Sequence, residues 1–525
     1  MDTSSALKTG VSGTRGVVGK DLHVQTALDL ARAFATASRL LSDSDGPIAV
    51  GRDTRLSGPM LQAAVVAGLL ECGADVLDLG VLPVPSFQTA IGLHGNLRGG
   101  VYVSASHNPV DHNGLKVYRP DGVILYPDQS DALDAMRTHE AWVTMRHARL
   151  GSLLGPHSPL SSAGPRSARE AIGAHIAGIV SRINCNLIRR ANLRVLVDYN
   201  NGTGCHATQA LLDALGVAQV VSLNDEPTGV FAHKPEPIPE HMAQLAAGVV
   251  ADFDIGFAQD PDADRVAIAA CVPRGGSVGQ VTGPVPAPSD VVGEAIGEEY
   301  TLALAAAATA DQAAAQGLVV SMATNYSTSR MTEALAARRG WPFRRCPVGE
   351  INVVTCLHDM ERNWQRGGHC AYPEAKGHFT FGGEGGGGVI DPRNQFCRDS
   401  LNAIALILQG LAAWKLGPGA SQLDRRLHLD DWRKAALEPC VIVKQTLPAG
   451  SATEQSRMMD AAANCYPNAP GVLEAATDDG VWISYEDRSW LHIRPSNTEP
   501  LIRVIAEHNT HAQAAAMVEA AIARL

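Results

Sequence analysis

Three aspartates occur at alternate positions directly after an apolar run. Asp260, Asp262 and Asp264 follow residues 253–258. Side chains two residues apart point the same way in an extended segment, so the three carboxylates are predicted to face one point. Carboxylates that close repel one another unless a cation joins them, and oxygen ligands favour Mg²⁺ before Ca²⁺. Taken alone, the motif fits a solvated acidic turn equally well.

A serine loop at residues 104–109 follows an apolar strand predicted at residues 100–103. In α/β proteins, loops at the carboxyl ends of parallel strands bind ligands. Ser106 is therefore a candidate nucleophile or phosphate carrier, with His107 beside it. Lys116, which heads the next strand, could exchange a proton if it faces phosphate and carboxylates. The alternative is an ordinary Ser-His-Asn-Pro turn and a solvated lysine.

Two further loops have the composition of binding sites. Residues 382–388 are glycine except for Glu384, so the backbone there is expected to approach a ligand or another loop closely, with Glu384 accepting sugar hydroxyls. Near the C-terminus, a strand is followed by donors that suit a phosphate clamp: Arg494, Ser496, Asn497 and Thr498. A lone clamp of this kind is weak evidence, and Arg503 either assists or is a surface charge.

A repeated pattern of strand, polar loop, helix, glycine and strand positions these loops. It occurs at residues 47–79, 193–223 and 317–343, and it is the α/β unit, in which helices cover a largely parallel sheet. The last hundred residues have short alternating strands and a closing helix. The predicted fold is three similar α/β domains with mixed sheets plus a smaller α+β C-terminal domain, with boundaries at 1–165, 166–275, 276–425 and 426–525.

Composition narrows the function classes. A chain of 525 residues that is 45% hydrophobic and 18% charged is typical of a globular protein of several domains. The net charge of −11 and 5% aromatic content argue against nucleic acid as the main partner. We expect no signal peptide, no membrane partner and no membrane span. Ten cysteines without a C-x-x-C pair suggest a reduced, cytoplasmic protein.

The four loops fall one per predicted domain, in order, and this arrangement resembles the α-D-phosphohexomutase family (phosphoglucosamine mutase, phosphomannomutase and phosphoglucomutase) over nearly the whole chain. Residues 12–16, Ser-Gly-Thr-Arg-Gly, also resemble the N-terminal signature of the family, with Arg15 in the active-site position. The resemblance implies four domains around a central cleft. It also implies a hexose phosphate as substrate and a monomer or homodimer as the assembly.

The resemblance further implies a mechanism. Ser106 would be phosphorylated at rest, and Ser106, Asp260, Asp262 and Asp264 would bind one Mg²⁺. The phosphoserine would convert a hexose monophosphate into a 1,6-bisphosphate, which also serves as activator and returns its other phosphoryl group after turning round. Arg265 would offset developing charge, and Lys116, Arg15 or His107 would handle the proton. The clamp of Arg494, Ser496, Asn497 and Thr498 would hold the phosphate that is not reacting.

The sequence departs from the family pattern in two loops. The sugar loop of the family often reads G-E-x-S-G-H, whereas here Glu384 stands without the serine and histidine. Pro261 and Ala263 stand where glycines are often found between the aspartates. The loop form is more similar to phosphoglucosamine mutases, so glucosamine is the expected hexose. Mannose or glucose mutases, a serine-dependent phosphatase and a non-catalytic sugar-phosphate binder are the alternatives.

Overall fold

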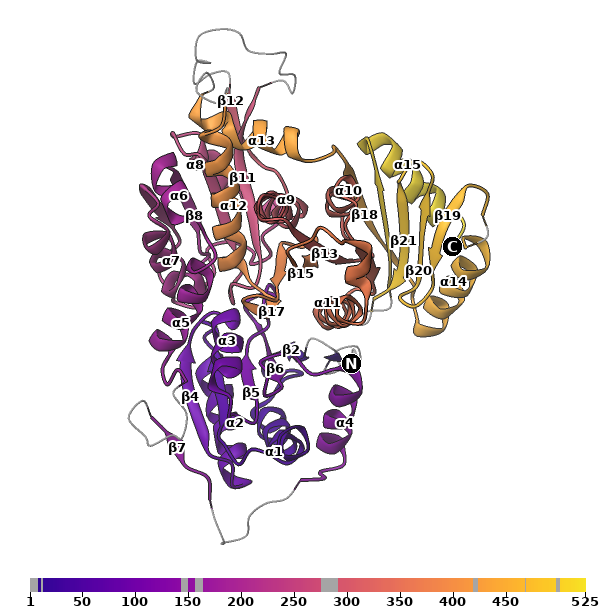
Figure 1. Cartoon of the computed structure of the whole chain (residues 1–525). Coiled ribbons are helices and arrows are strands. Elements are labelled where there is room, and N and C mark those ends of the chain that lie inside the picture. Colours follow the sequence, from indigo (N-terminus) through magenta and orange to yellow (C-terminus); the bar gives the residue numbers. More distant parts are fainter. Residues whose placement is uncertain are drawn as a thin grey trace. The chain divides into compact units, whose positions relative to one another are not determined.

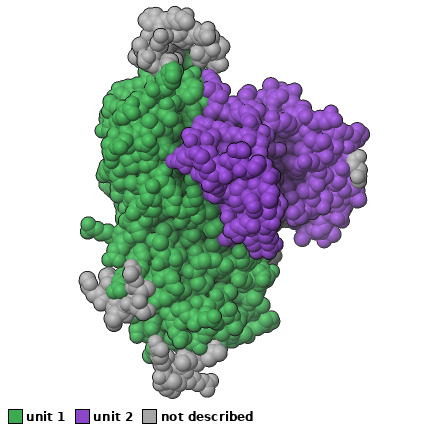
Figure 2. All heavy atoms as spheres, in the orientation of Figure 1, with its two compact units in different colours: residues 1–309, 387–433 green, residues 310–386, 434–525 purple. Residues whose placement is uncertain are grey.

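The computed structural model describes residues 8–10, 13–142, 150–155, 164–274, 291–418, 424–467, 469–496 and 501–525 (Figure 1). The chain forms two compact units (Figure 2). Unit 1 comprises residues 1–309 and 387–433, and unit 2 comprises residues 310–386 and 434–525. Each unit is therefore built from two separate stretches of the chain.

The N-terminal part of unit 1 is a mixed sheet covered by helices. Its strands lie in the order β1-β2-β6-β5-β3-β4-β7, with bounds β1 (Lys8–Gly10), β2 (Gly13–Val17), β3 (Ile48–Arg52), β4 (Val76–Val81), β5 (Gly100–Val103), β6 (His112–Tyr118) and β7 (Leu153–Leu154). β3 runs parallel to β4 and β5, whereas β6 is antiparallel to β5 and β2. The first predicted strand–helix–strand unit is thus confirmed. The Gly, Ser and Pro content of residues 151–169 predicts a linker there, but its first residues include β7, which pairs with β4 of the sheet.

Helices of this part pack on the sheet through apolar stripes. They are α1 (Val24–Leu41), α2 (Gly58–Glu71), α3 (Val84–His94) and α4 (Pro127–Thr138). Leu30 and Phe34 of α1 are buried in one core with Leu61 and Val65 of α2, while Leu41 is partly buried at its rim. Repeats at i, i+3 and i+4 place these side chains on one helix face.

A second mixed sheet in unit 1 has the order β12-β11-β10-β8-β9. Its strands are β8 (Arg194–Asp198), β9 (Gln219–Leu223), β10 (Ile255–Gln259), β11 (Val266–Pro273) and β12 (Val291–Ala295). β8 is parallel to β9 and β10, as the second predicted unit requires. β12 pairs with β11, so this sheet continues beyond the predicted boundary at residue 275. Residues 273–288 are rich in Gly and Pro, which predicts a surface loop or domain junction there; most of this stretch lies outside the described residues.

Further helices and a hairpin complete unit 1. The helices are α5 (Ala168–Val180), α6 (Cys185–Ala191), α7 (Thr208–Leu215), α8 (Ala243–Val249), α12 (Ser400–Lys415), α13 (His428–Ala436) and the first turns of α9 (Glu299–Gln316). β16 (Gly388–Asp391) pairs antiparallel with β17 (Gln395–Arg398). Among the described residues no single helix meets the length and hydropathy criteria for a membrane span, although α5 and α6 meet them as a pair bent by 83°.

Unit 2 begins with parallel strands, as the third predicted repeat requires. β13 (Leu318–Asn325) pairs in parallel with β14 (Phe343–Cys346) and β15 (Gly377–Glu384). α10 (Met331–Arg338) and α11 (Glu350–Gln365) connect them.

The C-terminal part of unit 2 is an antiparallel sheet in the order β18-β22-β21-β20-β19. Its elements are β18 (Val441–Pro448), β19 (Val472–Ala476), β20 (Val481–Tyr485), β21 (Trp490–Pro495), β22 (Leu501–His508), α14 (Ala452–Cys465) and α15 (His511–Ile522). Alternate residues serve opposite faces: Val481 and Ile483 pack in the core formed with α14 and α15, which cover one face in Figure 1. Trp482 and Trp490 pack on the other face with Tyr326.

Candidate active site

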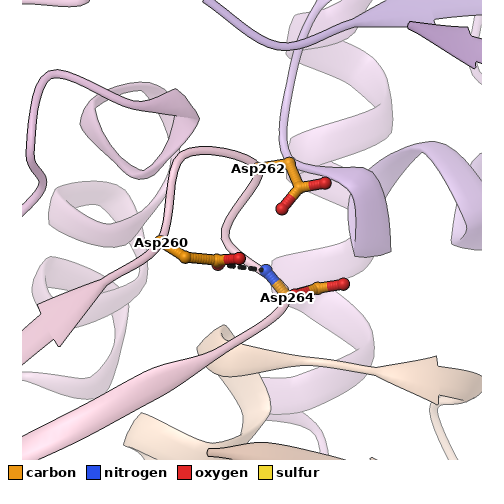
Figure 3. Close-up of side chains that lie close together, drawn as sticks. All are labelled: Asp260, Asp262 and Asp264. Atoms are coloured by element: carbon orange, nitrogen blue, oxygen red, sulfur yellow. Dashed lines mark hydrogen bonds between the residues drawn. The ribbon is translucent and has the colours of Figure 1, made fainter. Parts of the chain in front are cut away.

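The three predicted aspartates converge in a tight turn between β10 and β11 (Figure 3). One carboxylate oxygen of each lies within 4.8 Å of the others, and all three residues are buried. Asp260 organises the turn, because its Oδ1 accepts hydrogen bonds from the backbone N–H groups of Asp264 (3.1 Å) and Arg265 (3.0 Å). The predicted convergence is right, but the segment is a turn and not an extended strand. Ala263 takes φ 55° there, a left-handed conformation that favours glycine.

Ser106 lies directly against this turn. Its Oγ donates a hydrogen bond of 2.9 Å to Asp260 Oδ2 and lies 3.3 Å from His107 Nδ1. Its backbone N–H donates to Ser104 Oγ, which in turn donates to Asp262 Oδ2, both at 2.9 Å. Ser106 has φ 52°, and a non-glycine residue persists in that region only where its surroundings fix it. The serine and aspartate loops, predicted separately, therefore form one site.

Basic side chains surround the carboxylates on one side. Lys116 Nζ lies 2.7 Å from Asp262 Oδ2 and 3.6 Å from Asp264 Oδ2. Arg398 Nη2 lies 2.6 Å from Asp264 Oδ2, and Arg265 Nε lies 3.8 Å from Asp264 Oδ1. β2 carries Arg15, which pairs with Gly114 of β6. Burial lowers the pKa of the Arg15 guanidinium, on which the charges of Asp262, Arg398 and Arg265 also act, so Arg15 belongs to the same cluster.

The pKa values of Asp260 and Asp264 are shifted in opposite directions, because the basic side chains lie on the Asp264 side of the cluster. Burial raises the pKa of Asp260 well above its usual range, and the charges of Asp264 and Asp262 raise it further. Burial also acts to raise the pKa of Asp264, but Arg398, Lys116 and Arg265 outweigh it and leave that pKa below its usual range. Burial and the charges of Arg265 and Arg15 hold the pKa of His107 well below its usual value, so its ring is neutral at neutral pH.

The donor set of the turn fits a hard divalent cation. Asp262 Oδ1 and Asp264 Oδ1 are buried and accept no hydrogen bond from the described residues, although buried polar atoms are normally satisfied. Together with Asp260 and the Ser106 hydroxyl they offer only oxygen ligands, the set that Mg²⁺ prefers. A cation here would also compensate the charge that raises the pKa of Asp260.

The predicted sugar and phosphate residues lie in unit 2. Glu384, at the end of β15, is nearly buried, and its Oε1 accepts hydrogen bonds from Asn325 Nδ2 (2.9 Å) and the Gly349 N–H (3.1 Å). Arg494 lies at the end of β21, and burial lowers its pKa, with Asp479 and Glu384 among the charges that act on it. Ser496 is nearly buried, and its N–H donates to Leu501 O (2.9 Å). Asn497 and Thr498 lie outside the described residues.

The glycine run is explained by close backbone contacts. A Cβ on Gly382 would lie 2.1 Å from Ala323 O. A Cβ on Gly387, which has φ 82°, would lie 2.5 Å from Val266 O, just after the aspartate turn. Side chains at these positions would therefore displace backbone, as the prediction of a close approach requires.

Comparison with known proteins identifies the family. Models of the phosphoglucomutase/phosphomannomutase proteins match four consecutive parts of the chain: α/β/α domain I at residues 6–142, domain II at 174–272, domain III at 297–425 and the C-terminal domain at 449–524. A phosphoglucomutase/phosphomannomutase of Thermococcus kodakarensis is 30% identical over 527 residues, which covers 98% of this chain and 97% of that protein. The chain belongs to the phosphoglucomutase/phosphomannomutase family.

Other relatives agree with this assignment. A probable phosphoglucosamine mutase of Methanosphaera stadtmanae is 28% identical over 503 residues, covering 95% of this chain and 94% of that one. The crystal structure of a phosphoglucomutase/phosphomannomutase family protein from Burkholderia thailandensis has a TM-score of 0.73 at 23% identity and covers 98% of this chain and 96% of its own. The predicted family and fold class, three α/β domains and a smaller C-terminal one, are confirmed, and members of the family are phosphomutases.

Two residues that contact the serine and aspartate loops were missed from the sequence. Arg55 is fully buried and donates to Asp53 and to the carbonyl oxygens of Ser106, Asn108, Pro109 and His112. Arg398 holds Asp264 from a position 134 residues further along the chain. Arg55 follows the carboxyl end of β3, where α/β proteins place functional side chains, so its position was a usable signal. Nothing in the sequence connects Arg398 with Asp264.

Proposed function

We propose that this chain interconverts hexose 1-phosphate and hexose 6-phosphate, with Ser106 as the phosphoryl carrier. The observation that carries the proposal is the contact of Ser106 Oγ with Asp260 Oδ2 at 2.9 Å, inside a buried carboxylate cluster flanked by Lys116 and Arg398. A nucleophile beside carboxylates needs positive charge to accept a phosphoryl group, and this site supplies it from side chains on separate strands.

In the proposed cycle, a hydroxyl oxygen of the hexose phosphate attacks phosphorus on phosphoserine 106. The bond between phosphorus and Ser106 Oγ breaks, the hydroxyl proton passes to a base, and Ser106 takes up a proton. His107 is neutral and lies 3.3 Å from Ser106 Oγ, so it suits the proton exchange with the serine. Lys116 and Arg15 are the candidates on the sugar side. The second half of the cycle reverses these steps with the other phosphoryl group of the bisphosphate.

The residues that would hold Mg²⁺ are Asp260, Asp262, Asp264 and Ser106. When bound, the ion would neutralise charge on the transferring phosphoryl group. Arg265 and Arg398 lie on the Asp264 side of the cluster and would offset charge there.

Several residues of unit 2 have the chemistry to bind the part of a hexose phosphate that does not react. We assign Arg494, Ser496, Asn497 and Thr498 to the second phosphate, because a guanidinium fork with adjacent hydroxyl and amide donors matches phosphate oxygens. Glu384 is fixed by Asn325 and Gly349 and would accept hydrogen bonds from sugar hydroxyls. A clamp remote from the reacting atoms suits a substrate that must bind in two orientations.

We propose glucosamine phosphate as the hexose, on the form of the glycine–glutamate loop. The alternative is a mannose or glucose phosphate, which the name of the Thermococcus kodakarensis relative favours. We retain a cytoplasmic monomer or homodimer as part of the proposal.

The second candidate function is hydrolysis. Ser86 Oγ lies 3.0 Å from His175 Nδ1, and His175 Nε2 lies 2.8 Å from Asp399 Oδ2, which are the distances of a serine hydrolase triad. Both Ser86 and His175 are fully buried, and neither belongs to the cluster of aspartates that could hold a metal ion. A phosphatase acting through Ser106 would have no use for a clamp on a second phosphate.

One assay distinguishes a mutase from a phosphatase and identifies the preferred hexose. The protein is mixed with Mg²⁺, a trace of hexose 1,6-bisphosphate and, in parallel, the 1-phosphates of glucosamine, mannose and glucose. Conversion to the 6-phosphate supports the mutase, and the fastest sugar identifies the hexose. Release of inorganic phosphate would instead support a phosphatase, and no turnover of any sugar would contradict both enzymes.

A further inference from the structure

A cavity of about 600 Å³ lies in unit 2, lined by residues outside the proposed catalytic machinery. Its walls come from α10, β14, β19 and β20. β14 and β19 are the outer strands of their sheets among the described residues, so their free edges leave the space open. This volume is that of a site for a small molecule. The lining residues are Tyr326, Glu333, Ala337, Trp341, Phe343, Arg344, Arg345, Glu474, Ala475, Ala476 and Trp482.

The aromatic walls of this cavity are fixed before any ligand enters. Tyr326 stacks on Trp482 with ring centroids 5.5 Å apart. Arg345 lies over the Trp482 ring at 5.4 Å, and Glu333 Oε2 holds its guanidinium at 3.0 Å. Rings held in this way lose little conformational freedom when a planar molecule stacks on them.

One residue of the lining, Trp482, has a buried donor without a partner among the described residues. Trp482 is only 6% exposed, and its Nε1–H finds no acceptor among the described residues. A buried indole N–H normally has a partner. A ligand that occupies this cavity is therefore expected to offer an acceptor to Trp482 Nε1.

Two charged side chains of the lining are also available. Arg345 and Glu333 neutralise each other, which leaves Arg344 and Glu474. Both are exposed, and neither makes a hydrogen bond or ion pair in the described part of the chain. The cavity thus offers flat aromatic surface, one N–H donor, one cation and one carboxylate.

We infer that this cavity binds a nucleoside phosphate. A nucleobase stacks on aromatic side chains, its ring nitrogen or carbonyl accepts from Trp482 Nε1, and the phosphate pairs with Arg344. Among the bases, guanine offers N–H donors to a carboxylate such as Glu474 as well as acceptors to the indole. This inference does not depend on the proposed mutase activity, because the cavity shares no residue with that site.

Binding is tested by calorimetry with guanosine 5′-monophosphate on the full chain. Guanosine lacks the phosphate and ribose 5-phosphate lacks the base, so we expect each to bind at least about tenfold more weakly. The alternative occupant is a zwitterion whose charges would pair with Arg344 and Glu474. Free tryptophan represents this class, because it has an aromatic ring, a carboxylate and an ammonium group but no phosphate. Tryptophan binding more tightly than the nucleotide would overturn the assignment.

Two variants place the ligand in this cavity. Trp341→Ala and Arg344→Gln alter partly exposed or exposed residues, so the fold is expected to survive, and each should weaken nucleotide binding about tenfold. Arg362→Gln, on the exposed face of α11, is the matched control and should bind normally. The denaturant unfolding midpoint should be unchanged in all three variants, which shows that they are folded. No nucleotide binding at millimolar concentration, or equal affinity in both cavity variants and the wild type, would refute the site.

Discussion

Replacement of Arg55 by lysine tests how the serine loop is held in its reactive conformation. The Arg55 guanidinium meets five acceptors: Asp53 Oδ2 at 3.1 Å, the carbonyl oxygens of Ser106, Asn108 and Pro109 at 2.6 Å, and His112 O at 3.0 Å. A lysine ammonium has three donors. Lysine keeps the charge beside Asp53, but at least two of these five hydrogen bonds are lost.

The expected effect follows from this difference. Of the residues that supply the carbonyl acceptors, Ser106 is buried, whereas Asn108, Pro109 and His112 are partly or fully exposed. A buried acceptor without a donor destabilises the fold by about 1–3 kcal/mol, so Arg55→Lys should lower the free energy of unfolding by about that amount. Ser106 is kept at φ 52° only by its surroundings, and that conformation is unfavourable by about 1–3 kcal/mol. When these contacts of Arg55 are loosened, the Ser106 hydroxyl moves away from Asp260. A displacement of about 1 Å lowers kcat by roughly a hundredfold.

The assay combines denaturant unfolding, amide hydrogen exchange over residues 104–113 and steady-state turnover of the preferred hexose 1-phosphate. Arg52→Lys is the matched control, since Arg52 is the last residue of β3, three residues before Arg55, but donates to Gln62 and Asp53 O and not to the serine loop. Faster exchange and a lower kcat in Arg55→Lys alone would support the reasoning. Wild-type kcat in Arg55→Lys, or an equal loss in Arg52→Lys, would refute it.

Other predictions concern the stability of both units and the rival serine. Burial lowers the pKa of His492 to about 4, so the unfolded state binds more protons at this residue between pH 4 and its unfolded pKa of about 6.5. His492 should therefore contribute about 3 kcal/mol to the rise of stability with pH across that window, and in denaturant titrations the rise for His492→Gln should be smaller by about that amount. Ala263→Gly should keep full turnover and raise stability by up to about 1 kcal/mol, because Ala263 has φ 55°, which glycine adopts without strain. The control, Ala258→Gly in buried β10, should lower stability. A loss of stability in Ala263→Gly would contradict the argument that Ala263 is strained. Ser86→Ala removes the hydrogen bond to His175, so the variant should lose about 1 kcal/mol of stability and keep mutase turnover. Loss of turnover at unchanged stability would instead indicate that Ser86, His175 and Asp399 form a reactive site.

Local patterns predicted most of the elements that position the site. The strand, polar loop and helix at residues 47–79 appear as β3, α2 and β4, because apolar runs and glycine stops specify such units locally. The convergence of Asp260, Asp262 and Asp264 also followed from their spacing. The turn itself did not, since it depends on Asp260 accepting N–H groups four and five residues ahead.

Features that depend on contacts distant in sequence could not be predicted. Arg398 and Asp264 meet because β17 and the aspartate turn lie together in unit 1, and no local pattern encodes that ion pair. The left-handed conformation of Ser106 likewise results from Arg55, which lies 51 residues earlier. β12 was separated from its sheet in the sequence interpretation because a Gly/Pro-rich stretch precedes it, although it pairs with β11.

The central claim is that Ser106 carries the phosphoryl group. Its most direct test is mass spectrometry of the protein after incubation with Mg²⁺ and hexose 1,6-bisphosphate, followed by addition of hexose 1-phosphate. We predict one phosphoryl group on Ser106 that is lost to the sugar when substrate is added, and neither label nor turnover in a folded Ser106→Ala variant. A phosphoryl group on a different residue, or normal turnover by Ser106→Ala, would contradict the account.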